Sequence, residues 1–86
     1  MNHWRLPWTY LAEMQTRLAM KQWDEVVALF DVIEKIPTDR ASVAGNIHYM
    51  RGVAFTGLER FAEAQADLAA AEQIYAEVFG LSLIHI

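Results

Sequence analysis

Few residues in this sequence could carry out chemistry, and they are scattered. The three histidines, His3, His48 and His85, lie far apart, and none belongs to an i,i+4 pair or an H-E-x-x-H motif. The chain of 86 residues has no cysteine, which excludes disulfides, thiolate metal sites and cysteine nucleophiles. We therefore expect no catalytic residue, no metal site and no cofactor, and we interpret His48 as a partly exposed helix residue.

Three carboxylates recur at a spacing that would place them on one helix face. Glu59, Glu63 and Asp67 follow one another at i,i+4. Paired carboxylates act as general acids and bases only where burial perturbs their pKa values. Because the other face of this helix carries Phe61 and Leu68, we expect the acidic stripe to face water.

The charge balance limits the classes of partner. Lys and Arg number 7 against 11 Asp and Glu, so the formal net charge is -4. Nucleic acids and anionic membranes bind to clustered positive charge, which argues against both partners and against a helix-turn-helix in residues 57–71. The glycines of residues 52–57 follow no strand and lack the lysine of a phosphate loop. With no apolar run of about 18 residues and no basic leader, the sequence predicts a soluble, cytoplasmic protein.

The elements that position these residues are predicted to be helices. Apolar residues recur every three or four positions in residues 8–20, 23–36, 40–55 and 60–79, and no segment alternates as a strand does. Pro7 suits the first turn of a helix, and Pro37 is expected to end the second. Gly45 and Gly52 inside the third predict the close approach of another backbone. The fold class is all-α.

The second half of the sequence repeats the first at an offset of 38 residues, with Trp23 aligned to Phe61 and Phe30 to Leu68. A two-helix repeat with a period in the thirties indicates a solenoid. Residues 49–64 resemble the tetratricopeptide repeat (TPR), with Gly52 as the small residue of its first helix. The resemblance implies two stacked antiparallel hairpins, 7–38 and 39–80, after a lead-in at 1–6. The packing residues that it implies are Trp23, Val26, Phe30, Ile33, Gly52, Phe55, Phe61, Ala64, Leu68 and Ala71.

The same resemblance implies a concave groove that binds a peptide or protein segment. The residues that it places in the groove are Trp8, Leu11, Gln15, Leu18, Tyr49, Val53 and Thr56. The family's basic clamp for a peptide carboxylate needs Lys, Arg and Asn, where this chain has Leu11, Gln15, Tyr49 and Val53. We therefore expect apolar and aromatic contacts with the partner and a non-enzymatic interaction module.

The last six residues, 81–86, are nearly all apolar and resemble a translated sequencing adapter, so we interpret them as a non-native tail on a fragment of a larger scaffold or regulator. The competing interpretation is a native tail that docks on the end face. Two further functions stay open. The repeats could space or oligomerise a parent protein through the end face, with self-association of the chain, or present substrates to a larger enzyme.

Overall fold

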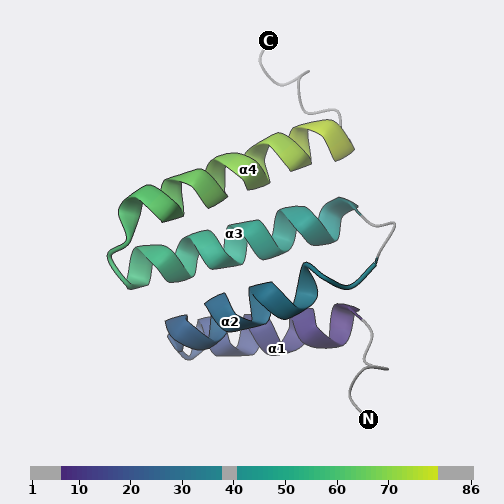
Figure 1. Cartoon of the computed structure of the whole chain (residues 1–86). Helices are drawn as coiled ribbons and strands as arrows, with labels where there is room; N and C mark the ends of the chain where they lie inside the picture. The colour runs from purple at the N-terminus through teal and green to yellow at the C-terminus, as the bar shows by residue number, and fades with distance from the viewer. Residues whose placement is uncertain (1–6, 38–40, 80–86) are drawn as a thin grey trace.

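The computed structural model describes residues 7–37 and 41–79, which form helices and short turns with no strand among them (Figure 1). The helices are α1 (Pro7–Ala19), α2 (Trp23–Ile33), α3 (Ala41–Gly57) and α4 (Phe61–Phe79). The predicted all-α fold class is confirmed. The predicted lead-in at 1–6 and tail at 81–86, with His3 and His85, lie outside the described residues.

The four helices stack in chain order, with α3 between the first pair and α4 (Figure 1). Helix α1 packs against α2, and α3 packs along the whole of α4. Both α1 and α2 also contact α3. Helix α3 therefore contacts each of the other three described helices.

The second helix ends earlier than predicted. Its last residue is Ile33, not Ile36, and the chain then turns with the N–H of Ile36 donating to the Ile33 carbonyl at 3.0 Å. Pro37 accounts for this, because its ring would clash with the carbonyl four residues earlier if the helix continued. By contrast, Pro7 opens α1 as predicted.

The turn between α1 and α2 and the turn between α3 and α4 have the same backbone pattern, 38 residues apart. Lys21 and Glu59 both adopt a left-handed conformation, with φ of 60° and 62°. Each closes a Schellman motif, in which the next N–H returns to the carbonyl five residues earlier. These bonds join Gln22 to Arg17 at 2.9 Å and Arg60 to Phe55 at 2.8 Å. Both turns thus lie at the 38-residue offset that aligns the two halves of the sequence.

The core lies where α1, α2 and α3 meet. Its buried side chains are those of Met14, Val26, Phe30, Ile33, Val43, Ile47, Met50 and Ala54. Most residues to which a packing role was assigned are buried here or between α3 and α4, namely Val26, Phe30, Ile33, Gly52, Phe55, Ala64 and Ala71. Trp23 is half-buried against the core.

Phe61 is more exposed than its expected packing role implies, with 61% of its surface exposed, whereas Leu68 is 37% exposed and packs against Gly52 of α3. Trp23, the counterpart of Phe61 in the first half, is covered by the end of α3 at Gly57. No helix follows α4 in the described part of the chain, so nothing there covers Phe61 in the same way. Phe61 therefore lies exposed at the start of α4.

Two glycines of α3 allow α4 to approach closely. A Cβ on Gly52 would lie 3.3 Å from the backbone oxygen of Ala64 and 2.8 Å from the Leu68 side chain. The predicted close approach of a backbone is confirmed there. At Gly45 the neighbour is a side chain, the ring of Tyr75, whose Cε1 would lie 2.9 Å from the added atom. Small residues on α3 thus set the contact between α3 and α4.

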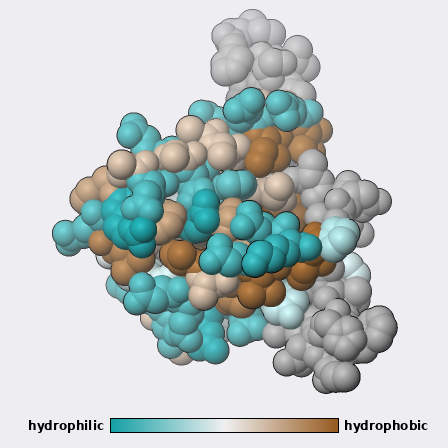
Figure 2. All heavy atoms as spheres, in the orientation of Figure 1, coloured by the Kyte–Doolittle hydropathy of each residue, from teal (hydrophilic) through white to brown (hydrophobic). Residues whose placement is uncertain are grey.

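Hydrophobic and hydrophilic side chains alternate over the face drawn in Figure 2. Within the described residues, no helix combines the length and hydropathy needed to cross a bilayer.

Candidate functional site

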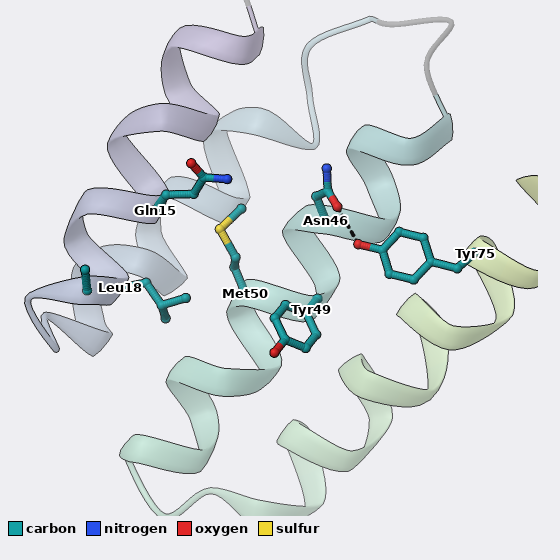
Figure 3. Close-up of a pocket in the computed structure, with 7 residues that line it drawn as sticks. Gln15, Leu18, Asn46, Tyr49, Met50 and Tyr75 are labelled. Atoms are coloured by element: carbon teal, nitrogen blue, oxygen red, sulfur yellow. Dashed lines mark hydrogen bonds between the residues drawn. The ribbon is translucent and has the colours of Figure 1, made fainter. Parts of the chain in front are cut away.

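A pocket is lined by residues of α1, α3 and the second half of α4, and it has a volume of about 610 Å³ (Figure 3). We call it the α1–α3 pocket. Its lining residues are Gln15, Leu18, Ala19, Asn46, Tyr49, Met50 and Tyr75. None of them carries a carboxylate, an imidazole or a basic group, so the lining is uncharged at neutral pH.

Helical periodicity explains how α1 and α3 supply these side chains. Gln15 and Leu18 are one turn apart on α1, and Asn46 and Tyr49 are one turn apart on α3. In Figure 3, Gln15 and Leu18 extend toward α3, while Met50 extends back toward α1. The pocket thus has apolar walls with carboxamide and phenol groups at its edges.

The pocket brings together some of the predicted groove residues and not others. Gln15, Leu18 and Tyr49 line it, and half of the Tyr49 surface (50%) is exposed. Leu11 packs partly buried against the core, and Trp8 is 56% exposed.

The remaining two predicted groove residues, Val53 and Thr56, continue the Tyr49 stripe along α3 beyond the pocket. Val53 is half-buried, and the exposed Thr56 donates its hydroxyl to the Gly52 carbonyl at 3.0 Å. A side chain whose hydroxyl is already bonded within its own helix is less available to a partner.

Four lining residues were missed by the sequence analysis: Ala19, Asn46, Met50 and Tyr75. Asn46 had a signal, since it lies three residues before Tyr49 on the same helical stripe. The sequence held no such signal for Tyr75. This residue comes from α4, and its ring reaches the pocket only because Gly45 has no side chain to block it.

A second polar cluster joins α3 to α4 through the buried carboxylate of Asp67. Arg51 donates to it twice, from Nε to Oδ2 at 2.7 Å and from Nη2 to Oδ1 at 2.9 Å. His48 Nδ1 lies 2.9 Å from Oδ1, and the Asp67 side chain is 5% exposed. The predicted solvated stripe of Glu59, Glu63 and Asp67 is therefore wrong at Asp67. We call His48, Arg51 and Asp67 the Asp67 cluster.

The Asp67 cluster also contacts α2 through one aromatic ring. The Arg51 guanidinium carbon lies 3.5 Å from the centroid of the Phe30 ring, and the His48 ring meets Phe30 edge-on with centroids 5.0 Å apart. Such cation–π and edge-to-face contacts add to the burial of the ring. The cluster therefore connects three helices and serves to hold them together.

Two opposing effects set the pKa of Asp67. Burial raises the pKa of the carboxyl, but the hydrogen bonds and positive charge of Arg51, with the His48 bond, outweigh burial and hold the pKa below its usual range. The pKa of Arg51 is raised by its hydrogen bonds to the carboxylate. Both groups are therefore charged at neutral pH.

We expect the lowered pKa of Asp67 to make the chain less stable in acid. Above the ordinary aspartate pKa of about 3.9, the carboxyl is ionised in both the folded and unfolded states and its contribution to stability is complete. Below this pH the unfolded chain takes up the proton first, so stability falls until the folded carboxyl is protonated too. Urea unfolding from pH 7 to pH 2 measures the loss, and Asp67→Asn should flatten the profile below about pH 4. An equally steep profile in that variant would contradict the assignment.

In the part of the chain that the structure describes, no group of three or more His, Asp or Glu side chains is arranged to hold a metal ion. Neither a family model, nor a curated protein, nor a solved structure matches the chain.

Proposed function

We propose that this chain is a non-enzymatic protein–protein interaction module that binds a peptide or protein segment at the α1–α3 pocket and along the adjoining groove. The observation that carries the proposal is the pocket itself, formed by three helices, uncharged, and bordered by the half-exposed ring of Tyr49. Tyrosine is favoured at binding surfaces because its ring supplies contact area at a low cost in conformational entropy.

Under this proposal the two hairpins are TPR-like repeats of an α-solenoid. The identical turns at Lys21 and Glu59 support the repeat, and the close contact of Gly52 with α4 supports the resemblance in the second hairpin. Helical repeats are usually stable only in stacks of about three or more, so we place the chain in a larger scaffold or regulator.

The absence of charge in the pocket lining favours binding over catalysis. A tyrosine can act as a general acid or base, but the pKa of Tyr75 in this lining is raised further from neutral pH. The groups that most often do this chemistry are a carboxylate, a histidine or a lysine within hydrogen-bond reach of the reacting group. The lining of the α1–α3 pocket contains none of these groups. The ionised groups of the Asp67 cluster bond to one another, which gives them a structural role.

The alternative is a spacer or oligomerisation repeat that acts through α4. One observation favours it: Phe61, Leu68 and Val78 expose 61%, 37% and 39% of their surfaces on this terminal helix. Exposed large apolar side chains grouped on one element are typical of an interaction surface. None of these three residues lines the α1–α3 pocket, so single substitutions can separate the two functions.

We expect Tyr49→Ala to weaken binding about tenfold, which is the loss typical of an anchoring aromatic residue. The probe is a peptide selected on the wild-type chain from a random phage-displayed library, with its Kd measured by fluorescence anisotropy. Phe61→Ala is the matched control, because it removes a similarly exposed aromatic ring that does not line the pocket. Far-UV circular dichroism checks that both variants remain folded.

The opposite pattern would assign binding to α4. If Phe61→Ala weakens peptide binding or breaks self-association while Tyr49→Ala changes nothing, the pocket is not the interaction site and the α4 alternative takes its place.

A further inference from the structure

Asn46 is held in one orientation by a residue from another helix. The Tyr75 hydroxyl donates a hydrogen bond to Asn46 Oδ1, and the tyrosine ring passes over Gly45 to reach it. Because this bond occupies the amide oxygen, the nitrogen of Asn46 is directed away from Tyr75, as Figure 3 shows. Asn46 therefore presents N–H donors at the edge of the pocket.

A carboxamide from the opposite helix faces the same space. Gln15, which is exposed on α1, extends its amide toward α3 (Figure 3). Unlike Asn46, it is not tied to Tyr75 and can rotate to offer either its donor or its acceptor. Between the two amides and Tyr49, the pocket walls are formed by the apolar side chains of Leu18, Ala19 and Met50.

These groups favour an uncharged acceptor in the ligand. A carboxylate or phosphate would find no basic group in the lining, and the chain already carries a net charge of -4. A cation would find no carboxylate and would face the N–H donors of Asn46. Burial raises the pKa of Tyr75, and the nearby Tyr49 adds to this, so the phenol that orients Asn46 stays protonated through neutral pH.

We infer that Asn46, oriented by Tyr75, donates a hydrogen bond to a main-chain carbonyl of an extended, uncharged peptide segment. One apolar side chain of that segment lies against Leu18, Ala19 and Met50. The main-chain carbonyl is the neutral acceptor that every peptide carries, and an extended segment directs it sideways, free of internal bonds. This inference rests on the proposed function and specifies which chemical group of the partner is recognised.

Three variants test the inference with the library-selected peptide as the probe. Asn46→Asp keeps an oxygen for the Tyr75 hydroxyl but removes both N–H donors, and Asn46→Ala removes the whole amide. We expect each to raise the Kd about tenfold, as the loss of a well-formed hydrogen bond does. Tyr75→Phe keeps the ring and releases the amide, so a smaller loss of about threefold is expected.

Backbone substitutions in the peptide identify the carbonyl that accepts the hydrogen bond from Asn46. Amide-to-ester replacement makes the adjoining carbonyl a weaker acceptor, and we expect one position of an ester scan to weaken binding to the wild-type chain but not to Asn46→Ala. The side-chain amide signal of Asn46 in an NMR titration should shift at the same peptide concentration.

The results separate this inference from the proposed function. If Tyr49→Ala weakens binding while both Asn46 variants keep the wild-type Kd, the pocket binds peptide and the role of Asn46 is refuted. Tighter binding by Asn46→Asp would also refute it, because it would show that the pocket prefers a cation. If neither Tyr49→Ala nor the Asn46 variants change the Kd, both proposals fail.

Discussion

Asp67→Ala is expected to destabilise the chain by about 3 kcal/mol, the lower end of the cost of breaking a buried ion pair. The substitution leaves Arg51 and His48 without the acceptor that they share. The side chains of Arg51 and His48 are 23% and 27% exposed, so water can partly replace the lost hydrogen bonds. The free-energy cost therefore stays at that lower end. Since domains of this size have a stability of about 5–15 kcal/mol, the loss is a large fraction of the total.

Thermal unfolding followed by circular dichroism should show the effect as a fall in Tm of about 15 °C. Glu63→Ala is the matched control, because Glu63 lies one turn earlier on α4 and pairs with Arg60 in an exposed bidentate contact, with Nε to Oε1 at 2.7 Å. Exposed ion pairs contribute little, so the control should keep the wild-type Tm within error. Equal losses in the two variants would show that the Asp67 cluster behaves as a surface ion pair.

A double substitution tests whether the cost of Asp67→Ala comes from the unpaired charge or from the lost hydrogen bonds. Buried ion pairs can be replaced by apolar residues of similar volume at little cost, because neither partner is then left uncompensated. We therefore expect Asp67→Leu with Arg51→Met to be more stable than Asp67→Ala, although it removes more polar groups. Lower stability of the double variant would show that the hydrogen bonds themselves, and not the unpaired charge, determine the cost.

The helices could be predicted because local rules determine them. Apolar residues at helical spacing marked all four, and Pro7 suits a first turn because its missing N–H is not needed there. The end of α2 was placed too late because the clash of Pro37 acts on the carbonyl of Ile33, several residues before the proline itself.

The interactions between helices could be predicted only in part. The stripe containing Tyr49 follows from periodicity, and extending it by one turn would have included Asn46. Tyr75 and Asp67 lie on α4, and their roles depend on the rotation of that helix against α3. Two small contacts fix this rotation, Gly45 with the Tyr75 ring and Gly52 with the Ala64 backbone. A charged residue among alanines is usually solvated, so nothing local distinguished Asp67 from Glu63.

Gly57→Ala is expected to destabilise the chain by about 2 kcal/mol, although alanine is the better helix former by about 1 kcal/mol. A Cβ at this position would lie 2.2 Å from Cε2 of Trp23 and 2.6 Å from Cδ2. These atoms belong to the rigid centre of the indole, which packs against the core and cannot move aside as a flexible side chain does. The overlap must therefore separate the end of α3 from the start of α2.

Gly52→Ala is the comparison, since its added Cβ would meet Cδ2 and Cγ of the partly exposed Leu68 side chain at 2.8 Å, and the Ala64 backbone oxygen only at 3.3 Å. We expect a smaller loss there, because Leu68 can rotate away, and urea unfolding of both variants measures the difference. Trp23→Phe should suppress the effect of Gly57→Ala, since the smaller ring leaves room for the methyl group. In a double-mutant cycle the pair would then cost less than the sum of the single substitutions. Additive losses would mean that Gly57 is required for its backbone and not for the space that it leaves to Trp23. The contact between α2 and α3 would then have to depend on other residues.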